Sequence, residues 1–196
     1  NFKILIKMEK NLSAQLLEEK KLHSFDFASC NPALYVGTYG KYNDGSIDGM
    51  WVDMTTFSDE EDFFDFCRLL HQDEADPEFM FQDYENMPYE LYNECLCPDE
   101  IDEIIAFANE TEEHREVMEA YVSNYGWSKQ LTWNDVSERY QGKFDSEEEF
   151  AEHIFDELYA YEMPDFARRY FDYEAFARDL FMGDYTFVDG HVFSDH

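Results

Sequence analysis

Asp and Glu are the most numerous residues in this chain whose side chains could take part in catalysis or binding. The sequence holds 46 Asp and Glu against 14 Lys and Arg, which gives a formal net charge of −32 over 196 residues. The stretch from His71 to Pro88, HQDEADPEFMFQDYENMP, has six carboxylates and no Lys or Arg, with aromatic residues and methionines threaded between them. Paired carboxylates can act as general acid and base, clustered ones can bind calcium, and a field of them attracts cationic partners.

Enzymatic and metal chemistry find little support in the spacing of residues. No carboxylate pair stands out from the chance pairs expected among so many acids, and the six histidines lack the H-E-x-x-H spacing of a zinc helix. Cys95 and Cys97 do not form a C-x-x-C pair and have no second pair to complete a zinc site. A calcium loop starting at Asp73 would place Ala75 and Pro77 where oxygen ligands are needed. We therefore expect no catalytic residue, no metal site and no cofactor.

The acids are unevenly distributed along the chain. Between Arg68 and Arg115, 46 residues contain 15 acids and no Lys or Arg. Acids in the first turns of helices are favoured by the helix dipole, but that does not explain why bases are missing from the later turns. A field of one sign steers partners of the opposite sign, so we expect a cationic protein partner. Direct binding of nucleic acid is not expected, because no basic patch is visible to contact phosphates.

Duplex DNA sets a scale for this charge. B-DNA has one charge per about 1.7 Å of axis, or roughly one per 100 Å² of a cylinder about 20 Å across. A compact protein of this mass exposes on the order of 9,700 Å², so the net charge of residues 22–196 averages roughly one per 290 Å². The chain would match DNA only if its acids gather on one side, over several neighbouring helices. The hypothesis is that the aromatic residues form a rigid scaffold and the acids imitate phosphates.

Periodicity predicts the elements that position these acids in the N-terminal half. Strands are expected at 33–39 and 50–54, on either side of a turn, and a short helix is expected within 11–22. A helix is expected over 57–71, with a capping box formed by Ser58 and Glu61. The apolar residues that share the inward face of this helix are Phe63, Phe66, Cys67 and Leu70.

The C-terminal half reads as further helices and a second set of strands. Helices are expected over 97–108, with Pro98 in the first turn, and over 111–126, ending at Gly126. A strand at 140–144 precedes a helix at 145–161 capped by Ser146 and Glu149, one or two helices within 163–181, and a hairpin at 185–193 that turns at Asp189-Gly190. The inward residues of the helices at 97–108 and 145–161 are expected to be Ile101, Ile104, Ile105, Ala108, Phe150, Ile154 and Leu158.

The predicted fold class is α+β, in an elongated chain of three small sub-domains behind a basic N-terminal extension at 1–30. An N-terminal sub-domain at 31–97 has a small antiparallel sheet with a helix and runs into the acidic segment; a central helical sub-domain spans 98–130, and a mixed sheet–helix sub-domain spans 131–196. No signal peptide or membrane-spanning stretch is expected. The four cysteines predict free thiols in a reducing cytoplasm.

Four blocks in the same order along the chain closely resemble the ArdA antirestriction proteins. They read NPALYVGTYGKYNDGSIDGMWVDM, LLHQDEADPEFMFQDYENMP, YQGKFDSEEEFAEHI and YFDYEAFARDLFMGDYTFVDGHVF. The similarity covers about residues 31–196, and the basic extension at 1–30 has no counterpart in it.

The resemblance implies a function. Members of this family are acidic, elongated homodimers, joined through the C-terminal sub-domain, that imitate bent B-form DNA and occupy the DNA-binding groove of type I restriction–modification enzymes, blocking restriction and often modification. They are encoded by conjugative plasmids and transposons, so the protein would act in the cytoplasm of a bacterial host. Tyr140 and Phe144 would lie near the dimer seam. The acids expected on the DNA-like surface are Asp73, Glu74, Asp76, Glu78, Asp83, Glu85, Asp99, Glu100, Asp102, Glu103, Glu110, Glu112, Glu113, Glu147, Glu148, Glu152, Asp156 and Glu157.

Two other functions stay open at this point. An acidic module that buffers cations or binds another kind of protein would also carry this charge, and would be recognised by tight calcium sites. A hydrolase would need one carboxylate pair in a cleft, with the pKa values of the two groups shifted apart.

Overall fold

The computed structural model describes the backbone of residues 2–159, 161 and 163–196, and side chains from Leu12 onward except that of Asp165. It has helices and two three-stranded antiparallel sheets, which confirms the α+β class. The contacts divide the chain into two compact units, residues 1–115 and 116–196. The boundary falls inside a helix, and the finer division into three sub-domains stays a prediction.

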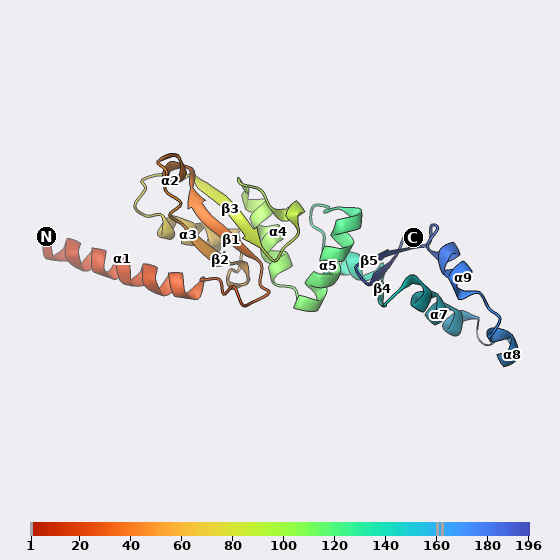
Figure 1. The fold of residues 1–196 in the computed structure, drawn as a ribbon. Helices are drawn as coiled ribbons and strands as arrows, with labels where there is room; N and C mark the ends of the chain where they lie inside the picture. The colour runs from red at the N-terminus through yellow and green to blue at the C-terminus, as the bar shows by residue number, and fades with distance from the viewer. Residues whose placement is uncertain (1, 160, 162) are drawn as a thin grey trace. The chain divides into compact units, whose positions relative to one another are not determined.

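The first unit is built around the sheet β2-β1-β3 (Figure 1). Strand β1 (Ala33–Thr38) lies between β2 (Met50–Asp53) and β3 (Phe79–Glu85) and is almost wholly buried. Strand β3 lies in the acidic stretch and was not among the expected elements. Its second half alternates exposed and half-buried residues, with Asp83 and Glu85 exposed. The aromatic residues of β3 are therefore sheet residues. A β-bulge between Phe81 and Asp83 shifts the register, so the acids Asp83 and Glu85 lie on the opposite face of the sheet from Phe81 and Tyr84.

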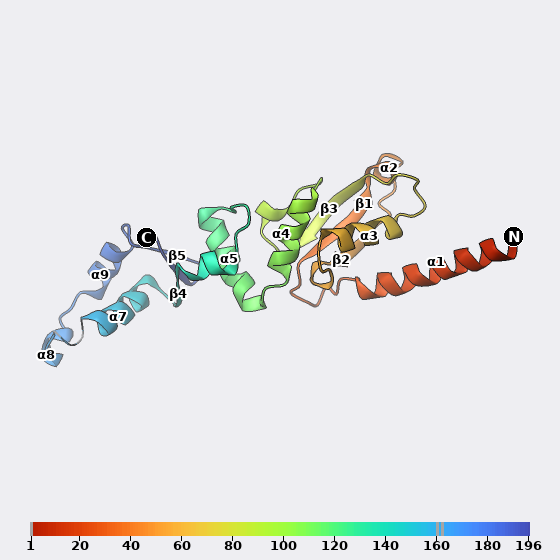
Figure 2. The ribbon, with the colours of Figure 1, turned by 180° about the vertical axis from the view of Figure 1, so that it is seen from behind.

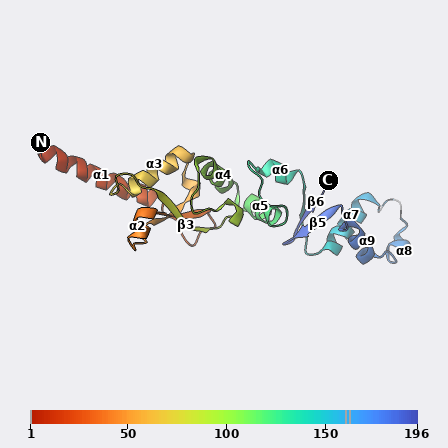
Figure 3. The ribbon, with the colours of Figure 1, turned by 90° about the horizontal axis from the view of Figure 1, so that it is seen from above.

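Helix α3 (Glu60–Leu70) covers one face of this sheet, with the ring of Phe63 5.9 Å from that of Phe81 on β3 (Figures 2 and 3). Its expected inward residues are all buried. The expected capping box is wrong by one residue. The N-cap is Asp59, whose carboxylate accepts from the backbone N–H of Asp62 at 2.9 Å, whereas Ser58 donates its hydroxyl to the Asp62 side chain. A carboxylate in extended backbone at the helix start caps as well as a serine does.

Besides the sheet, α3 and the N-terminal helix, the first unit contains short elements and a second helix of the length of α3. These are α2 (Tyr39–Asn43), the 3₁₀ turns η1 (Met54–Thr56) and η2 (Tyr89–Leu91), and α4 (Pro98–Ala108). Pro98 opens α4, and the four expected inward residues of that helix are buried, as predicted.

Helix α1 (Phe2–Leu22) is longer than the short helix expected within 11–22. Its end is joined to the sheet. His23 is buried with its ring stacked 4.2 Å from that of Phe57, its carbonyl accepts from the N–H of Asp53 at 2.9 Å, and Ser24 pairs with Val52. The basic extension therefore ends as part of the first unit.

The second unit holds the sheet β4-β6-β5. Helix α5 (Glu112–Tyr125) crosses the unit boundary and ends, as expected, before Gly126, whose φ is +78°. After α6 (Trp133–Ser137) come β4 (Tyr140–Lys143), β5 (Tyr185–Val188) and β6 (His191–Ser194). The hairpin turn has φ +48° at Asp189 and +85° at Gly190, the conformation that an Asp-Gly turn favours.

Helices α7 (Glu147–Leu158) and α9 (Tyr173–Leu180) lie side by side, with the short α8 (Asp165–Arg168) between them in sequence (Figures 1 and 3). Ser146 caps α7 as expected, and Phe150 and Ile154 are buried. The expected capping box is wrong in its second half, because Glu149 accepts from the N–H of Asp145 at 2.6 Å and not from that of Ser146. Leu158, expected to be inward, is 60% exposed. Phe155 continues the buried face instead, because the ring of Phe171 packs 4.3 Å from it.

Candidate functional site

The eighteen acids expected on the functional surface all reach solvent. Fourteen are exposed, and the remaining four, Glu74, Glu100, Glu103 and Glu110, are half-buried. Nine fall in residues 73–102, on the loop before β3, on β3 itself and on the start of α4, and five fall on α7. The remaining four are Glu103 on α4 and Glu110, Glu112 and Glu113 near the start of α5. These acids lie on both compact units, so each unit is described separately below.

In the loop after α3, two of the expected acids have structural roles. Lys41, with 15% of its side chain exposed, donates from Nζ to Asp73 and to Asp48, each at 3.1 Å. The hydrogen bond from Lys41 lowers the pKa of Asp73. The hydroxyl of Thr38 donates to Glu74 at 2.7 Å. Asp73 and Glu74 thus fasten the loop to α2 and β1, and part of their charge is compensated.

The same lysine fixes the protonation of a buried histidine. Its Nζ lies 3.1 Å from Nδ1 of His71, and Nε2 of His71 lies 3.4 Å from the carbonyl oxygen of Val36. Burial lowers the pKa of His71, and the nearby Lys41 lowers it further. A neutral ring that accepts from Lys41 and donates to Val36 satisfies both contacts.

Some acids of α4 accept hydrogen bonds from backbone N–H groups at helix starts, and others are exposed to solvent. Glu100 accepts from the N–H of Cys97 at 2.8 Å at the start of its own helix, and Asp102 accepts from the N–H of Glu60 at 2.8 Å. Asp102 therefore also satisfies a free N–H group at the start of α3. Asp99 is exposed, as are Asp83 and Glu85 on β3.

Near the start of α5, Glu110 pairs with Nδ1 of His114 at 2.8 Å. The Cys30 thiol donates to the carboxylate of Glu112, which raises the pKa of the thiol. Glu113 is exposed. Both contacts lie within the first unit, so part of the charge of Glu110 and Glu112 is engaged by neighbouring side chains.

The most concentrated acids are those of α7. Its twelve residues carry six carboxylates and no Lys or Arg. Glu148, Glu152 and Asp156 follow one another at four-residue spacing, about 6 Å of helix rise each. Asp156 lies 3.6 Å from Arg168 and Glu157 lies 3.7 Å from His153. Within the part of the chain that the structure describes, Glu147, Glu148 and Glu152 have no ion pair, so their field reaches the solvent.

The two residues expected at a dimer seam both pack inside the second unit. The hydroxyl of Tyr140 lies 3.0 Å from Nδ1 of His191, and the ring of Phe144 lies 5.1 Å from that of Phe150. Both are half-buried. Their role in a dimer stays a prediction.

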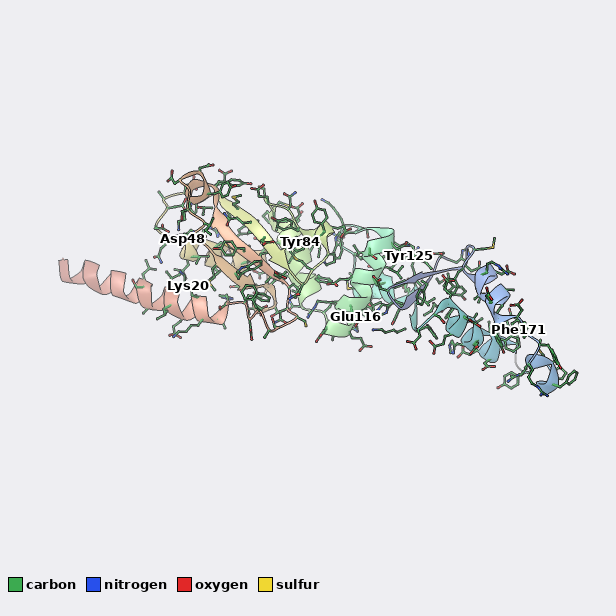
Figure 4. The ribbon with its side chains drawn as sticks, in the orientation of Figure 1. Lys20, Asp48, Tyr84, Glu116, Tyr125 and Phe171 are labelled. Atoms are coloured by element: carbon green, nitrogen blue, oxygen red, sulfur yellow. The ribbon has the colours of Figure 1, made fainter. Side chains whose placement is uncertain are left out.

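A polar cluster beside them was not anticipated from the sequence. Glu116 on α5, labelled in Figure 4, accepts from Lys143 of β4 at 2.6 Å and lies 3.4 Å from Nε2 of the buried His191. The hydrogen bond from Lys143 lowers the pKa of Glu116. At the other end of α5, the hydroxyl of Tyr125 donates to Asp195 at 2.5 Å (Figure 4). These contacts hold α5 against the sheet. No local sequence pattern predicts them, because the partners are 27 to 75 residues apart.

Among the described residues, no group of three or more His, Cys, Asp or Glu side chains is placed to hold a metal ion. No helix in the searched part of the chain is long and apolar enough to cross a membrane. The arrangement that the structure does offer is a set of exposed carboxylates on a scaffold of aromatic cores, which is suited to binding a strongly cationic surface.

Comparison with known protein families gives one match. The family described as antirestriction protein (ArdA) matches residues 34–194. The match takes in nearly all of β1 through β6 and leaves out α1. A comparison with curated proteins finds no match.

Proposed function

The chain belongs to the ArdA family of antirestriction proteins, and from this we propose that it inhibits type I restriction–modification enzymes by occupying their DNA-binding groove as a mimic of duplex DNA. Antirestriction activity follows from the family. The target class and the mimicry are the proposal, and it extends to modification, because a methyltransferase core blocked in its groove can neither recognise nor methylate DNA.

The observation that supports the mimicry best is the distribution of charge. All eighteen expected acids reach solvent, and α7 carries six carboxylates without a single Lys or Arg. Like charges four residues apart on a helix destabilise it by about 0.2–0.5 kcal/mol per pair. A surface that imitates phosphates needs like charges at close spacing, so it needs a core that offsets their repulsion. The aromatic cores of this chain provide that stability.

The proposal includes a homodimer formed through the C-terminal part of the chain, with Tyr140 and Phe144 near the contact. Two copies double the length of acidic surface available to a groove. The site of action is the cytoplasm of a bacterial host, and the protein would be encoded on a conjugative element whose incoming DNA it protects.

The test is a paired assay of cleavage and methylation by a purified type I enzyme on unmodified plasmid. Both activities should fall as protein is added and should recover when more duplex DNA is supplied. The triple variant Glu147→Gln, Glu148→Gln, Glu152→Gln should inhibit more weakly. A matched control is Glu18→Gln on α1, outside the family match, which should inhibit like the unchanged protein. Full cleavage and methylation at saturating protein would refute the proposal.

A further inference from the structure

A cavity of about 750 Å³ opens in the second unit where the first turn of α7 meets α9 and β5. Its rim is formed by Asp145 just before α7, by Glu147 and Glu148 in the first turn of α7, and by Glu174 and Arg178 from α9. All of these residues belong to one compact unit, so the shape of the cavity does not depend on how the two units are arranged.

The floor of the cavity is apolar and continuous with the core of the unit. Phe181, Met182 and Phe187 line it. The rings of Phe181 and Phe187 meet edge to face, with centroids 6.4 Å apart, and the ring of Phe181 also lies 5.6 Å from that of the buried Phe150. Both floor phenylalanines pack against the core cluster. The floor is therefore a fixed surface, while Met182 is 78% exposed at its edge.

The rim of the cavity is charged and uncompensated. It has four carboxylates, those of Asp145, Glu147, Glu148 and Glu174, against the one guanidinium of Arg178. Across the described chain no ion pair involves any of these five side chains. An apolar aromatic floor under an anionic rim is complementary to a flat cation carried on an apolar stem. Arginine has that form, because its guanidinium stacks on aromatic faces and pairs with carboxylates at its edge.

We propose that this cavity binds an arginine side chain that projects from the DNA-binding groove of the inhibited enzyme. The inference rests on the proposed function and names one specific contact within it. Arginine is a principal residue by which proteins hold phosphates. The rim carboxylates would take the place of a phosphate, and the rings beneath would add a stacking contact that a DNA backbone lacks. Arg178 lies in the same rim and would compete with the incoming cation.

The direct test needs no restriction enzyme. The full-length protein, labelled at its methionine methyl groups, is titrated with N-acetyl-arginine methylamide and followed by NMR at Met182. The corresponding lysine and citrulline amides serve as controls, since citrulline keeps the shape of the side chain without its charge. A saturable shift, tighter for arginine than for lysine by about two- to fivefold and absent for citrulline, is expected from the stacking contact. Equal, non-saturating shifts with arginine and lysine would show diffuse charge attraction and overturn the proposal.

Two variants locate the contact. Glu174→Gln removes a rim charge from an exposed position and should weaken arginine binding, whereas Arg178→Gln removes the competing cation and should strengthen it. If Arg178→Gln left arginine binding unchanged or weakened it, the assignment of the rim would be wrong.

An inhibition assay separates this proposal from the broader one. Phe187→Leu keeps the net charge and the apolar floor but removes the ring, so it should inhibit a type I enzyme about two- to fivefold less well than the unchanged protein. A thermal melt of the variant shows whether the unit remains folded, and Glu174→Gln repeats the measurement without touching the core. If both variants inhibit fully while Glu152→Gln, which lies on α7 outside the cavity, inhibits more weakly, the cavity proposal falls and the DNA-mimic function stands. If the unchanged protein does not inhibit at all, the proposed function fails, and the arginine titration still decides whether the cavity binds.

Discussion

Neutralising Glu152 should stabilise the protein and weaken its function at the same time. Glu152 is exposed on α7 and has three acids within one turn: Glu148 and Asp156 four residues away and Glu149 three residues away. Each such pair costs about 0.2–0.5 kcal/mol. The Arg168 guanidinium beside Asp156 shields one of them. We therefore expect Glu152→Gln to raise the free energy of unfolding by about 0.5–1 kcal/mol, and the melting temperature by about 1–4 °C.

The effect on inhibition should have the opposite sign. If Glu152 stands in for one phosphate, its loss lowers the slope of log affinity against log salt by at most about 0.9. If the variant and the unchanged protein bind equally well in 1 M salt, the variant should bind up to about eightfold more weakly in 0.1 M salt. In 1 M salt, where the Debye length is about 3 Å, both the stabilisation and the loss of affinity should nearly vanish.

The assay is a thermal melt and a competition measurement on the same preparations, each repeated at several salt concentrations. Glu18→Gln, which removes an exposed acid that pairs with Lys21 at 3.4 Å, should change neither inhibition nor its salt slope. Stabilisation by Glu152→Gln with unchanged inhibition would show that this part of α7 faces away from the partner. Complete loss of inhibition in a folded Glu152→Gln protein would point to a discrete site in place of a distributed one.

Three further predictions concern the scaffold. The pKa of His71 is lowered in the folded chain from its ordinary value of 6.5, so the unfolded chain takes up the proton first as the pH falls. The contribution of His71 to the free energy of unfolding should therefore be full above pH 6.5 and decrease as the pH drops below it. Denaturant titrations should show a smaller decrease with pH for His71→Gln. Gly49→Ala would press a methyl group against the carbonyl oxygen of Val36. Urea unfolding should therefore show a loss of about 1–3 kcal/mol in the free energy of unfolding, and an unchanged midpoint would contradict the contact. Asp102→Ala removes the acceptor of the Glu60 N–H and should cost about 0.5–2 kcal/mol, whereas Asp102→Asn keeps an oxygen there and should unfold near the original midpoint.

The helices and the hairpin turn could be predicted because their signals are local. Pro98 at the start of α4, Gly126 after α5 and the Asp189-Gly190 turn each act within a few residues, and the structure confirms them. Strand β3 escaped prediction because carboxylates occupy its two exposed positions and a β-bulge interrupts the two-residue alternation that marks a strand in sequence.

The candidate site was predictable in composition and only partly in role. That the acids would reach solvent followed from their number and the absence of compensating bases. That Asp73 is held by Lys41, and that Asp102 caps a helix 42 residues away, did not follow, because both contacts join segments distant in the sequence. Leu158 was misplaced for a similar reason, since the covering of the last turn of α7 depends on Phe171, which comes later in the chain.

Competition with DNA tests the central claim most directly. A fluorescent duplex carrying the recognition sequence is titrated with a type I methyltransferase core at a series of fixed protein concentrations. Mimicry predicts that the apparent Kd for DNA rises in proportion to added protein without reaching a plateau, and that this effect weakens steeply with salt. An apparent Kd that does not move, or that levels off as DNA and protein bind together, would contradict it.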